Sequence, residues 1–526
     1  MLTAQQNMVT SWSFKTENKG RLYAKVTAPD GSTKAVPSFL AGDGRMHLRY
    51  SSSLLGVHAY TMCWEDGANV WPAGETGEIE VVAYLGKNPF YTHGRVRRAA
   101  GKKYLEHTDG KPFFYLGDTW WMGVTNRISY PAEFAMLTAD RVEKGFNVVQ
   151  IVAGLFPDMD GFDPRGANEA GLAWKPGFAG INAEYFDQAE KRILHLVDQG
   201  ITPCIVGSWG YYRDMTSEDV LKQHWDNLIA RFAAYPVIWC IAGEAVMPYY
   251  LTKNNEAEAR AFWTKMGKYI EKSDPFGNML TIHPTQRGNE QVDDESIIGF
   301  DMLQTGHRGP FSLLNSIQEA KECLDRDNLP VLVDEACYEG ICGSSGADVQ
   351  RYLVLSTVLT GCCGFCYGAD GIWQMSSNRQ PYGASPHGAT WGDSFWEDSY
   401  KLPGGKHVGQ IRRFFELFEW WNFQPHMEWI ENPCEYETIT GSFAAGIPGK
   451  VRVIYTPLFS FDFGGQNLVK NIEPDITYFA YHYDPINHKL IDFGQVHPDK
   501  NGCWVSPSSS AFQDWVLVLS VEKLEL

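Results

Sequence analysis

Two glutamates follow apolar segments that have the character of buried strands. One apolar run, 237–242, ends just before Glu244, and another, 331–333, leads into Asp334 and Glu335. An ionised carboxylate is costly to bury unless a partner compensates it. Each glutamate is therefore either a member of a structural ion pair or a catalytic group. Few arginines lie near the ends of the predicted strands, so we favour catalysis.

A pair of carboxylates is what glycoside hydrolysis requires. One protonates the leaving oxygen, and the other attacks the sugar or activates a water molecule. Glu244 and Glu335 are the predicted catalytic pair. Because Asp334 and Glu335 are consecutive on a strand, their side chains should point to opposite sides, and only one of them should face the inside of the fold.

Side chains suited to binding a sugar lie at the other predicted strand ends. Acids, amides and histidines bind hydroxyl groups, and indole rings pack on the apolar face of a sugar. The predicted substrate-binding residues are Asp118, Trp120, Trp121, Gln150, Trp209, His283, Gln304, His307, Tyr367, Asp370 and Trp373. Structural roles remain open for several of them. Asp118 could cap a helix, His283 and His307 could be structural histidines, and at most one of Trp120 and Trp121 should line a pocket.

Eight short apolar segments separated by amphipathic helical patterns would position these residues. The predicted strands are 113–117, 147–152, 201–207, 237–242, 280–283, 298–303, 331–334 and 361–367. Eight strand–helix units of this length predict an α/β fold, a (β/α)₈ TIM barrel, in which the chemistry lies at the carboxyl ends of the strands. A doubly wound sheet is the alternative, but no glycine-rich phosphate loop follows any of the strands.

The segments before and after the barrel alternate polar and apolar residues, with turns between them, as β-sandwiches do. We expect an N-terminal β-sandwich over residues 1–95, the catalytic barrel over 96–431 and a C-terminal β-sandwich over 432–526. The basic segment Arg95–Lys103 is expected to be a solvated linker.

The composition excludes several other classes of protein. A formal net charge of −18 opposes binding to nucleic acid or anionic membranes. There is no apolar run long enough for a membrane span and no signal-peptide pattern. Most of the eleven cysteines lie in apolar runs, which favours a cytoplasmic protein.

No cofactor or metal site is predicted. The pair Cys363 and Cys366 has ligand spacing, but residues three apart on a strand face opposite ways. The acidic loop from Asp158 to Asp163 lacks the glutamate that completes an EF-hand. No Gly-x-Ser-x-Gly motif supports a serine hydrolase.

Several segments together give the chain a family resemblance. It resembles the apiosidase-like glycoside hydrolases of the (β/α)₈ class in KPFFYLGDTWWMG (111–123), NVVQIV (147–152), IWCIAGE (238–244), PVLVDEA (330–336), YGADGIWQ (367–374) and DWVLVL (514–519). The resemblance covers nearly the whole chain. It implies a retaining glycosidase with the acid/base at Glu244, the nucleophile at Glu335 and a pocket-lining aspartate at Asp118.

Two positions depart from this pattern. Relatives often have Gly-Asp, and the wider clan Asn-Glu, where this chain has Gly243-Glu244. Relatives also often have His or Asn before the IWQ element, where this chain has YGADG. Apiose is therefore not implied as the substrate.

We expect a cytoplasmic retaining exo-glycosidase that acts on small oligosaccharides or glycosides, furanosides included, in a pocket closed by the two β domains. The partner is a carbohydrate substrate, and a homo-oligomer is compatible with the sequence. A non-catalytic carbohydrate-binding protein is the alternative from another class, and it predicts carboxylates too far apart for either mechanism. A transglycosidase would use the same two acids.

Overall fold

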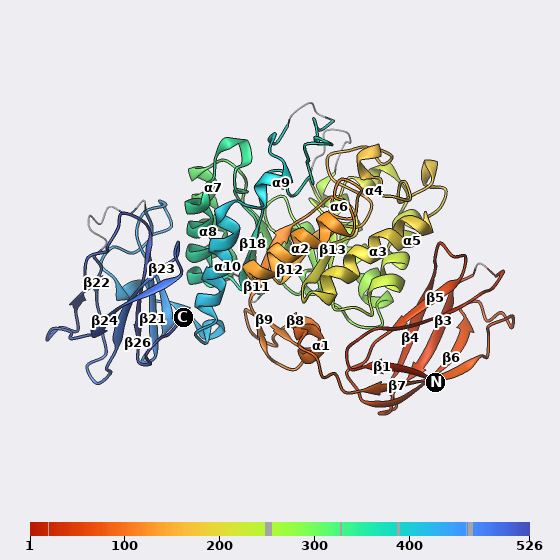
Figure 1. Cartoon of the computed structure of the whole chain (residues 1–526), viewed down its shortest axis with the longest axis horizontal. Helices are drawn as coiled ribbons and strands as arrows, with labels where there is room; N and C mark the ends of the chain where they lie inside the picture. The colour runs from red at the N-terminus through yellow and green to blue at the C-terminus, as the bar shows by residue number, and fades with distance from the viewer. Residues whose placement is uncertain (19, 248–254, 327–328, 387–389, 459, 461–465) are drawn as a thin grey trace.

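The computed structural model describes residues 1–18, 20–247, 255–326, 329–386, 390–458, 460 and 466–526. Figure 1 shows a central barrel with β-rich regions at opposite ends of the molecule, the N-terminal one in red and the C-terminal one in blue.

Eight parallel strands form a nearly closed barrel in the order β15-β14-β13-β12-β11-β18-β17-β16. They are β11 Tyr115–Thr119, β12 Val148–Val152, β13 Thr202–Val206, β14 Ile238–Gly243, β15 Leu280–His283, β16 Asp301–Gln304, β17 Val331–Glu335 and β18 Gly364–Tyr367. All their residues except Gln304 are buried, because helices cover the outside and side chains fill the inside. Each of the eight strands overlaps its predicted range, with ends that differ from the prediction by up to three residues.

Helices surround the barrel. They are α2 Ala132–Lys144, α3 Ala183–Asp198, α4 Tyr212–Met215, α5 Glu218–Phe232, α6 Glu256–Ser273, α7 Pro310–Arg326, α8 Ala347–Thr360, α9 Trp396–Ser399 and α10 Pro403–Phe415. α3 illustrates their origin: Phe186, Ala189 and Ile193 form one buried face, and the Asn182 side chain accepts a hydrogen bond from the Tyr185 N–H at the first turn.

The connection from β15 to β16 differs from the predicted strand–helix pattern. It contains two 3₁₀ turns, Asn289–Gln291 and Glu295–Ile297, and no α-helix. Pro284, Gly288 and Gly299 interrupt this short segment, and each disfavours helix formation.

The N-terminal region is a seven-stranded sheet in the order β1-β7-β6-β3-β4-β5-β2. Its strands are β1 Leu2–Gln5, β2 Thr10–Phe14, β3 Leu22–Thr27, β4 Thr33–Leu40, β5 Met46–Tyr50, β6 Gly56–Trp64 and β7 Thr76–Val82. They bury a core of their own that includes Leu22, Val26, Leu48 and Ile79. β4 and β5 contact α5 of the barrel.

The basic segment after this region is folded, so the prediction of a solvated linker was wrong. After the short helix α1 Pro89–His93, the strands β8 Val96–Arg98, β9 Leu105–His107 and β10 Pro112–Phe113 form a three-stranded sheet. Nη1 of Arg95 donates hydrogen bonds to the Ala233 carbonyl (3.2 Å) and to Asn278 Oδ1 (2.7 Å), which ties the segment to the barrel.

The C-terminal region contains a six-stranded sheet, β19-β20-β21-β26-β23-β24, and a two-stranded sheet, β22-β25. The strands are β19 Gln424–Pro425, β20 Phe443–Ile447, β21 Val451–Thr456, β22 Leu468–Val469, β23 Phe479–Asp484, β24 Lys489–Gln495, β25 Trp504–Val505 and β26 Trp515–Ser520. β19 precedes the predicted boundary at residue 431. A buried ion pair between Arg351 of α8 and Asp514 (2.6 Å) joins this region to the barrel.

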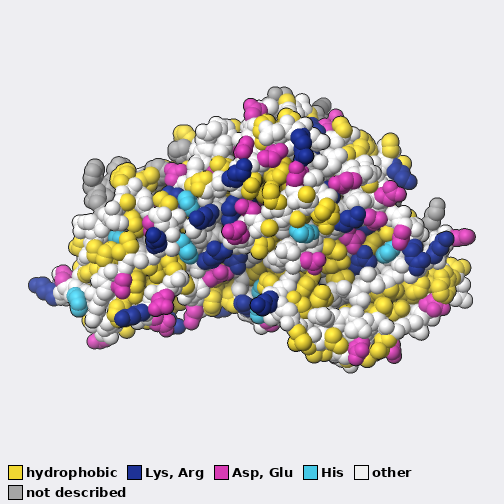
Figure 2. All heavy atoms as spheres, in the orientation of Figure 1, with side chains coloured by type: hydrophobic (Ala, Val, Ile, Leu, Met, Phe, Trp, Pro, Cys, Tyr) yellow, Lys and Arg dark blue, Asp and Glu magenta, His cyan; other side chains and the backbone are white. Residues whose placement is uncertain are grey.

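On the face shown in Figure 2, the Lys and Arg side chains are interspersed with Asp and Glu and form no continuous cationic patch. Among the helices of the described residues, none is both long and apolar enough to cross a membrane.

Candidate active site

A cavity of about 310 Å³ opens at the carboxyl ends of the barrel strands. Its lining residues are Trp121, Pro157, Asp158, Trp209, Glu244, Met247, Gln304, His307, Glu335, Tyr338, Ile341, Trp373 and Trp391. All of them belong to the barrel. Within the described chain, neither β-rich region contributes to the wall, so the expectation that the two β domains close the pocket was wrong.

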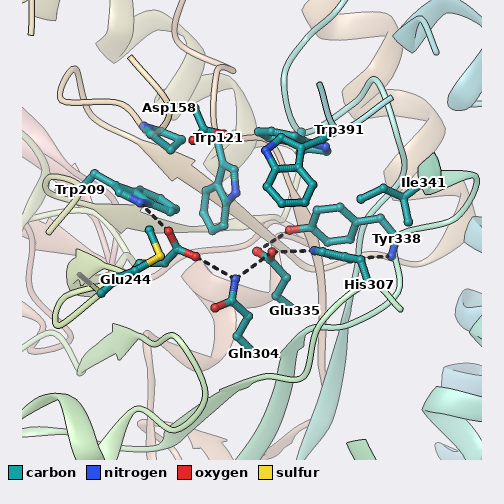
Figure 3. A pocket seen from close by; sticks show the side chains of 13 residues that line it. Trp121, Asp158, Trp209, Glu244, Gln304, His307, Glu335, Tyr338, Ile341 and Trp391 are labelled. Atoms are coloured by element: carbon teal, nitrogen blue, oxygen red, sulfur yellow. Dashed lines mark hydrogen bonds and ion pairs between the residues drawn. The ribbon is translucent and has the colours of Figure 1, made fainter. Parts of the chain in front are cut away.

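One amide connects the two glutamates at the centre of the pocket (Figure 3). Nε2 of Gln304, at the end of β16, donates to Oε1 of Glu244 at 3.1 Å and to Oε1 of Glu335 at 3.1 Å. These two carboxylate oxygens therefore lie no further apart than twice 3.1 Å.

Glu335 is surrounded by hydrogen-bond donors. Oε1 accepts from Nε2 of His307 (2.9 Å), and Oε2 accepts from the Tyr338 hydroxyl (2.7 Å) and lies 3.4 Å from Nε2 of His283. Burial by itself would raise the pKa of this carboxyl, but the hydrogen bonds from His283 and His307 outweigh it and hold the pKa well below its ordinary value. Glu335 is thus kept ionised.

Glu244 has the opposite electrostatic environment. Its Oε2 accepts a hydrogen bond from the Trp209 indole (3.0 Å) and its Oε1 accepts one from the Gln304 amide, and both of these donors are uncharged. Burial, and then the charge of Glu335, raise the pKa of Glu244 to about 7. Two neighbouring carboxyls whose pKa values are moved apart can serve as an acid and an anion at the same pH.

A β-bulge brings both acids of the Asp334-Glu335 pair inward. Leu303 pairs with Val333, but the next residue, Gln304, pairs with Glu335, so Asp334 is an extra residue in β17. Asp334 contacts Gln150 and His283 inside the barrel, while Glu335 reaches the pocket. The prediction that only one of the two would face inward was wrong, because it assumed a regular strand.

His283 lies beneath the pocket and is fully buried. Its Nδ1 lies 2.6 Å from Oδ2 of Asp334, and its Nε2 faces Glu335. Burial would lower the pKa of this imidazole, but its pairing with Asp334 and Glu335 raises the pKa to about 10. His283 is therefore a positioning residue that stays protonated and holds Glu335 as an anion.

Replacing this histidine should change the pH profile. In His283→Gln we expect the acid limb of kcat/KM to move upward by about one to three pH units, because Glu335 loses a neighbouring cation and its pKa rises. His195→Gln, on α3 outside the pocket, is the matched control and should leave the limb in place. An acid limb that does not move in His283→Gln would contradict this role.

The backbone at Glu244 is shaped to present its carboxylate. The register between β14 and β15 shifts between Cys240 and Gly243, and Glu244 has a left-handed φ of 46°, which is rare for a residue with a side chain. A Cβ atom on Gly243 would lie 2.3 Å from the Trp209 ring. Glycine at this position therefore makes room for the indole that bonds Glu244.

Adding a methyl group at Gly243 should displace that indole. We expect Gly243→Ala to lower kcat/KM by about 10- to 100-fold, because a small displacement of Trp209 misplaces the Glu244 carboxylate. In Gly180→Ala, the matched control, the nearest atom to the new Cβ is 3.9 Å away. Equal activity in the two variants would show that the close approach does not matter for turnover.

Seven of the predicted residues meet in the pocket wall: Glu244, Glu335, Trp121, Trp209, Gln304, His307 and Trp373. Gln150 and His283 lie underneath and reach the site through Asp334. Asp118, Trp120, Tyr367 and Asp370 are buried and do not line the pocket.

Three of these four residues have structural partners instead, and Asp370 is buried. Asp118 forms a buried ion pair with Arg141 of α2 (2.6 Å) and accepts a hydrogen bond from the Trp120 indole (2.6 Å). The Tyr367 hydroxyl donates to Glu339 (2.6 Å). The pocket-lining role implied for Asp118 by the family resemblance is therefore not seen in this structure. Of the two adjacent tryptophans, Trp121 faces the pocket and Trp120 packs in the core.

Six wall residues were not among the predicted catalytic or substrate-binding residues: Pro157, Asp158, Met247, Tyr338, Ile341 and Trp391. Tyr338 could have been considered from the sequence, because it follows the predicted catalytic Glu335 by only three residues. The others lie on loops whose course the strand pattern does not predict. No cluster of three or more His, Cys, Asp or Glu residues in the described parts of the chain is placed to hold a metal ion.

Comparison with known families identifies the barrel. The model for the catalytic domain of apiosidase-like proteins matches residues 99–422, well over half of the chain. The chain belongs to the apiosidase-like family. It is a glycoside hydrolase, with its carboxylate pair at the strand ends where barrel enzymes place their chemistry.

Solved structures similar to this apiosidase-like chain share its fold. A glycoside hydrolase of family 5 from Bacteroides vulgatus has 20% sequence identity and a TM-score of 0.66, with 82% of this chain and 94% of that chain covered. A second Bacteroides vulgatus protein, described as a candidate glycoside hydrolase, has 17% identity and a TM-score of 0.68, with 99% and 100% covered. No curated protein sequence matches the chain.

Proposed function

We propose that this apiosidase-like protein is a retaining glycosidase that works by double displacement, with Glu335 as the nucleophile and Glu244 as the acid/base. The observation that carries the proposal is the shared Gln304 donor, 3.1 Å from an oxygen of each glutamate. Carboxyl groups stand about 5–5.5 Å apart in retaining enzymes and about 6.5–9.5 Å apart in inverting ones. The largest possible separation of the two bonded carboxylate oxygens, twice 3.1 Å, is therefore below the range for inverting enzymes.

In the first step, an oxygen of Glu335 attacks the anomeric carbon while the Glu244 carboxyl gives its proton to the leaving oxygen. The glycosidic bond breaks, and the sugar is held as an ester of Glu335. In the second step, Glu244 takes a proton from water, the hydroxide oxygen attacks the anomeric carbon, and Glu335 leaves as a carboxylate. The proton returns to Glu244, so the enzyme is regenerated.

The pocket wall supports a small uncharged glycoside as the substrate. Among the described residues, four tryptophans line it, Trp121, Trp209, Trp373 and Trp391, and no lysine or arginine does. Indole rings pack on sugar faces, and a cation would be needed to balance an anionic sugar. A panel of nitrophenyl pyranosides and furanosides should reveal the preferred sugar.

The decisive test of retention is the anomer formed first. Proton NMR during turnover of the best nitrophenyl glycoside should show the product with the substrate's anomeric configuration before mutarotation. The opposite anomer as the first product would exclude double displacement.

The alternative functions make different predictions. A non-catalytic sugar-binding protein was expected to have widely separated carboxylates, and the shared Gln304 bond argues against it. A transglycosidase would transfer the sugar to an added alcohol in preference to water, which the same NMR experiment detects.

A further inference from the structure

A second cavity, of about 220 Å³, lies between the N-terminal sheet and the barrel. Lys34 of β4 and the residues after β5 form one side of it, and Arg95 and Phe276 form the other. It shares no lining residue with the catalytic pocket. Its chemistry is also different, because two cations line it.

Both cations lie over the same aromatic ring. Nζ of Lys34 and Cζ of Arg95 are each 5.4 Å from the centroid of Phe276. Lys34 donates to the Pro275 carbonyl (2.5 Å), and Nη1 of Arg95 donates to the carbonyls of Ala233 and Phe276 and to Asn278 Oδ1. All these acceptors are uncharged.

No carboxylate compensates the two charges directly. Among the described residues, neither Lys34 nor Arg95 has an acidic partner within 4.0 Å. Asp274 is the acid whose charge acts on both, but its oxygens accept hydrogen bonds from the Trp239 indole and from the backbone of Phe276 and Asn278. The cavity therefore keeps a net positive charge inside a protein of net charge −18.

Each cation also has more N–H donors than the hydrogen bonds described for it use. A lysine ammonium has three N–H donors, and Lys34 uses one; an arginine has five, and all the hydrogen bonds described for Arg95 come from Nη1. Partial burial, followed by the repulsion from Arg95, lowers the pKa of Lys34. An anion between the two would relieve this repulsion and use the remaining donors.

We propose that this cavity binds a tetrahedral oxyanion, a phosphate or sulfate group, between Lys34 and Arg95. An arginine fork and a lysine point charge are the usual pair for such groups. The bound anion would connect β4 of the N-terminal sheet to the segment between α1 and β8, which Arg95 ties to the barrel, and so stabilise the contact between the two regions. The cavity is larger than one inorganic ion, so an organic phosphate ester is a second source of the same group.

The test is thermal unfolding of the full-length protein at pH 7 with inorganic phosphate, sulfate or glucose 6-phosphate, each compared with chloride at equal ionic strength. At about ten times Kd we expect a saturable rise in Tm of about 2 °C. A rise with inorganic phosphate or sulfate identifies the free ion, and a rise with glucose 6-phosphate alone identifies an ester. The same Tm in all four solutions would overturn the proposal.

Substitutions of Lys34 test whether the anion binds in this cavity. Lys34→Met keeps the side-chain stem over Phe276 and should abolish the rise, whereas Lys34→Arg should keep it. Lys25→Met, an exposed lysine on the adjacent strand β3, is the matched control and should respond as the unchanged protein does. Calorimetric titration of the unchanged protein with phosphate measures binding without any variant. A full rise in Lys34→Met, or no heat of binding for an ion that raised Tm, would overturn the proposal.

Discussion

Glu335→Ala is expected to lower kcat/KM for aryl glycosides by at least about 10⁴-fold, because the variant has no atom to form the glycosyl ester. Azide fits the space that the carboxylate leaves and should restore turnover by attacking the anomeric carbon directly. The product should be the glycosyl azide of inverted configuration. Liquid chromatography and NMR of the product measure both effects.

The matched control for this variant is Glu339→Gln. Glu339 is another buried acid four residues further along the chain, and it bonds Tyr367 and the backbone of Gly404 outside the pocket. This control should keep most of its activity. Substantial activity in Glu335→Ala without azide would remove Glu335 from the nucleophile role.

Glu244→Ala is expected to show a loss that depends on the leaving group. General acid catalysis contributes about 10²- to 10⁴-fold, so glycosides with basic leaving groups should lose that much. Dinitrophenyl glycosides need no protonation and should form the glycosyl-enzyme at a nearly unchanged rate. Azide should then release the glycosyl azide of retained configuration, opposite to the product of Glu335→Ala.

The same variant tests the pKa of Glu244. The acid must be protonated in the free enzyme, so kcat/KM of the unchanged protein should fall as the pH rises through about 7. Glu244→Ala has no such group, and this basic limb should disappear. A basic limb that persists at the same pH would assign it to another residue.

The strand ends could be predicted from the sequence because buried parallel strands leave a strong apolar pattern, and Glu244, Gln304 and Glu335 each end such a run. Which side chains reach the pocket was less predictable. The bulge at Asp334 leaves no mark in the residue pattern, since its effect depends on pairing with β16.

Contacts between residues far apart in the sequence were the second feature of the site that could not be predicted. Asp118 follows the predicted strand 113–117 as a pocket residue would, yet it lies within β11, and Arg141 from α2 holds it in the core. Nothing near Asp118 in the sequence indicates that pairing. Trp391 lies far beyond β18, the last barrel strand, and only the folded loop brings it to the pocket wall.

The buried pair of His283 and Asp334 has a consequence for how this family can diverge. Removing His283 leaves the buried Asp334 without its cationic partner, and breaking a buried ion pair in this way costs about 3–5 kcal/mol. That is a large part of the 5–15 kcal/mol that keeps a typical protein folded. The two positions are therefore expected to covary among relatives, with histidine and aspartate retained together or replaced together by an uncharged pair. Lineages with the uncharged pair would have to keep their nucleophile ionised by another cation, and their activity would shift toward a different pH.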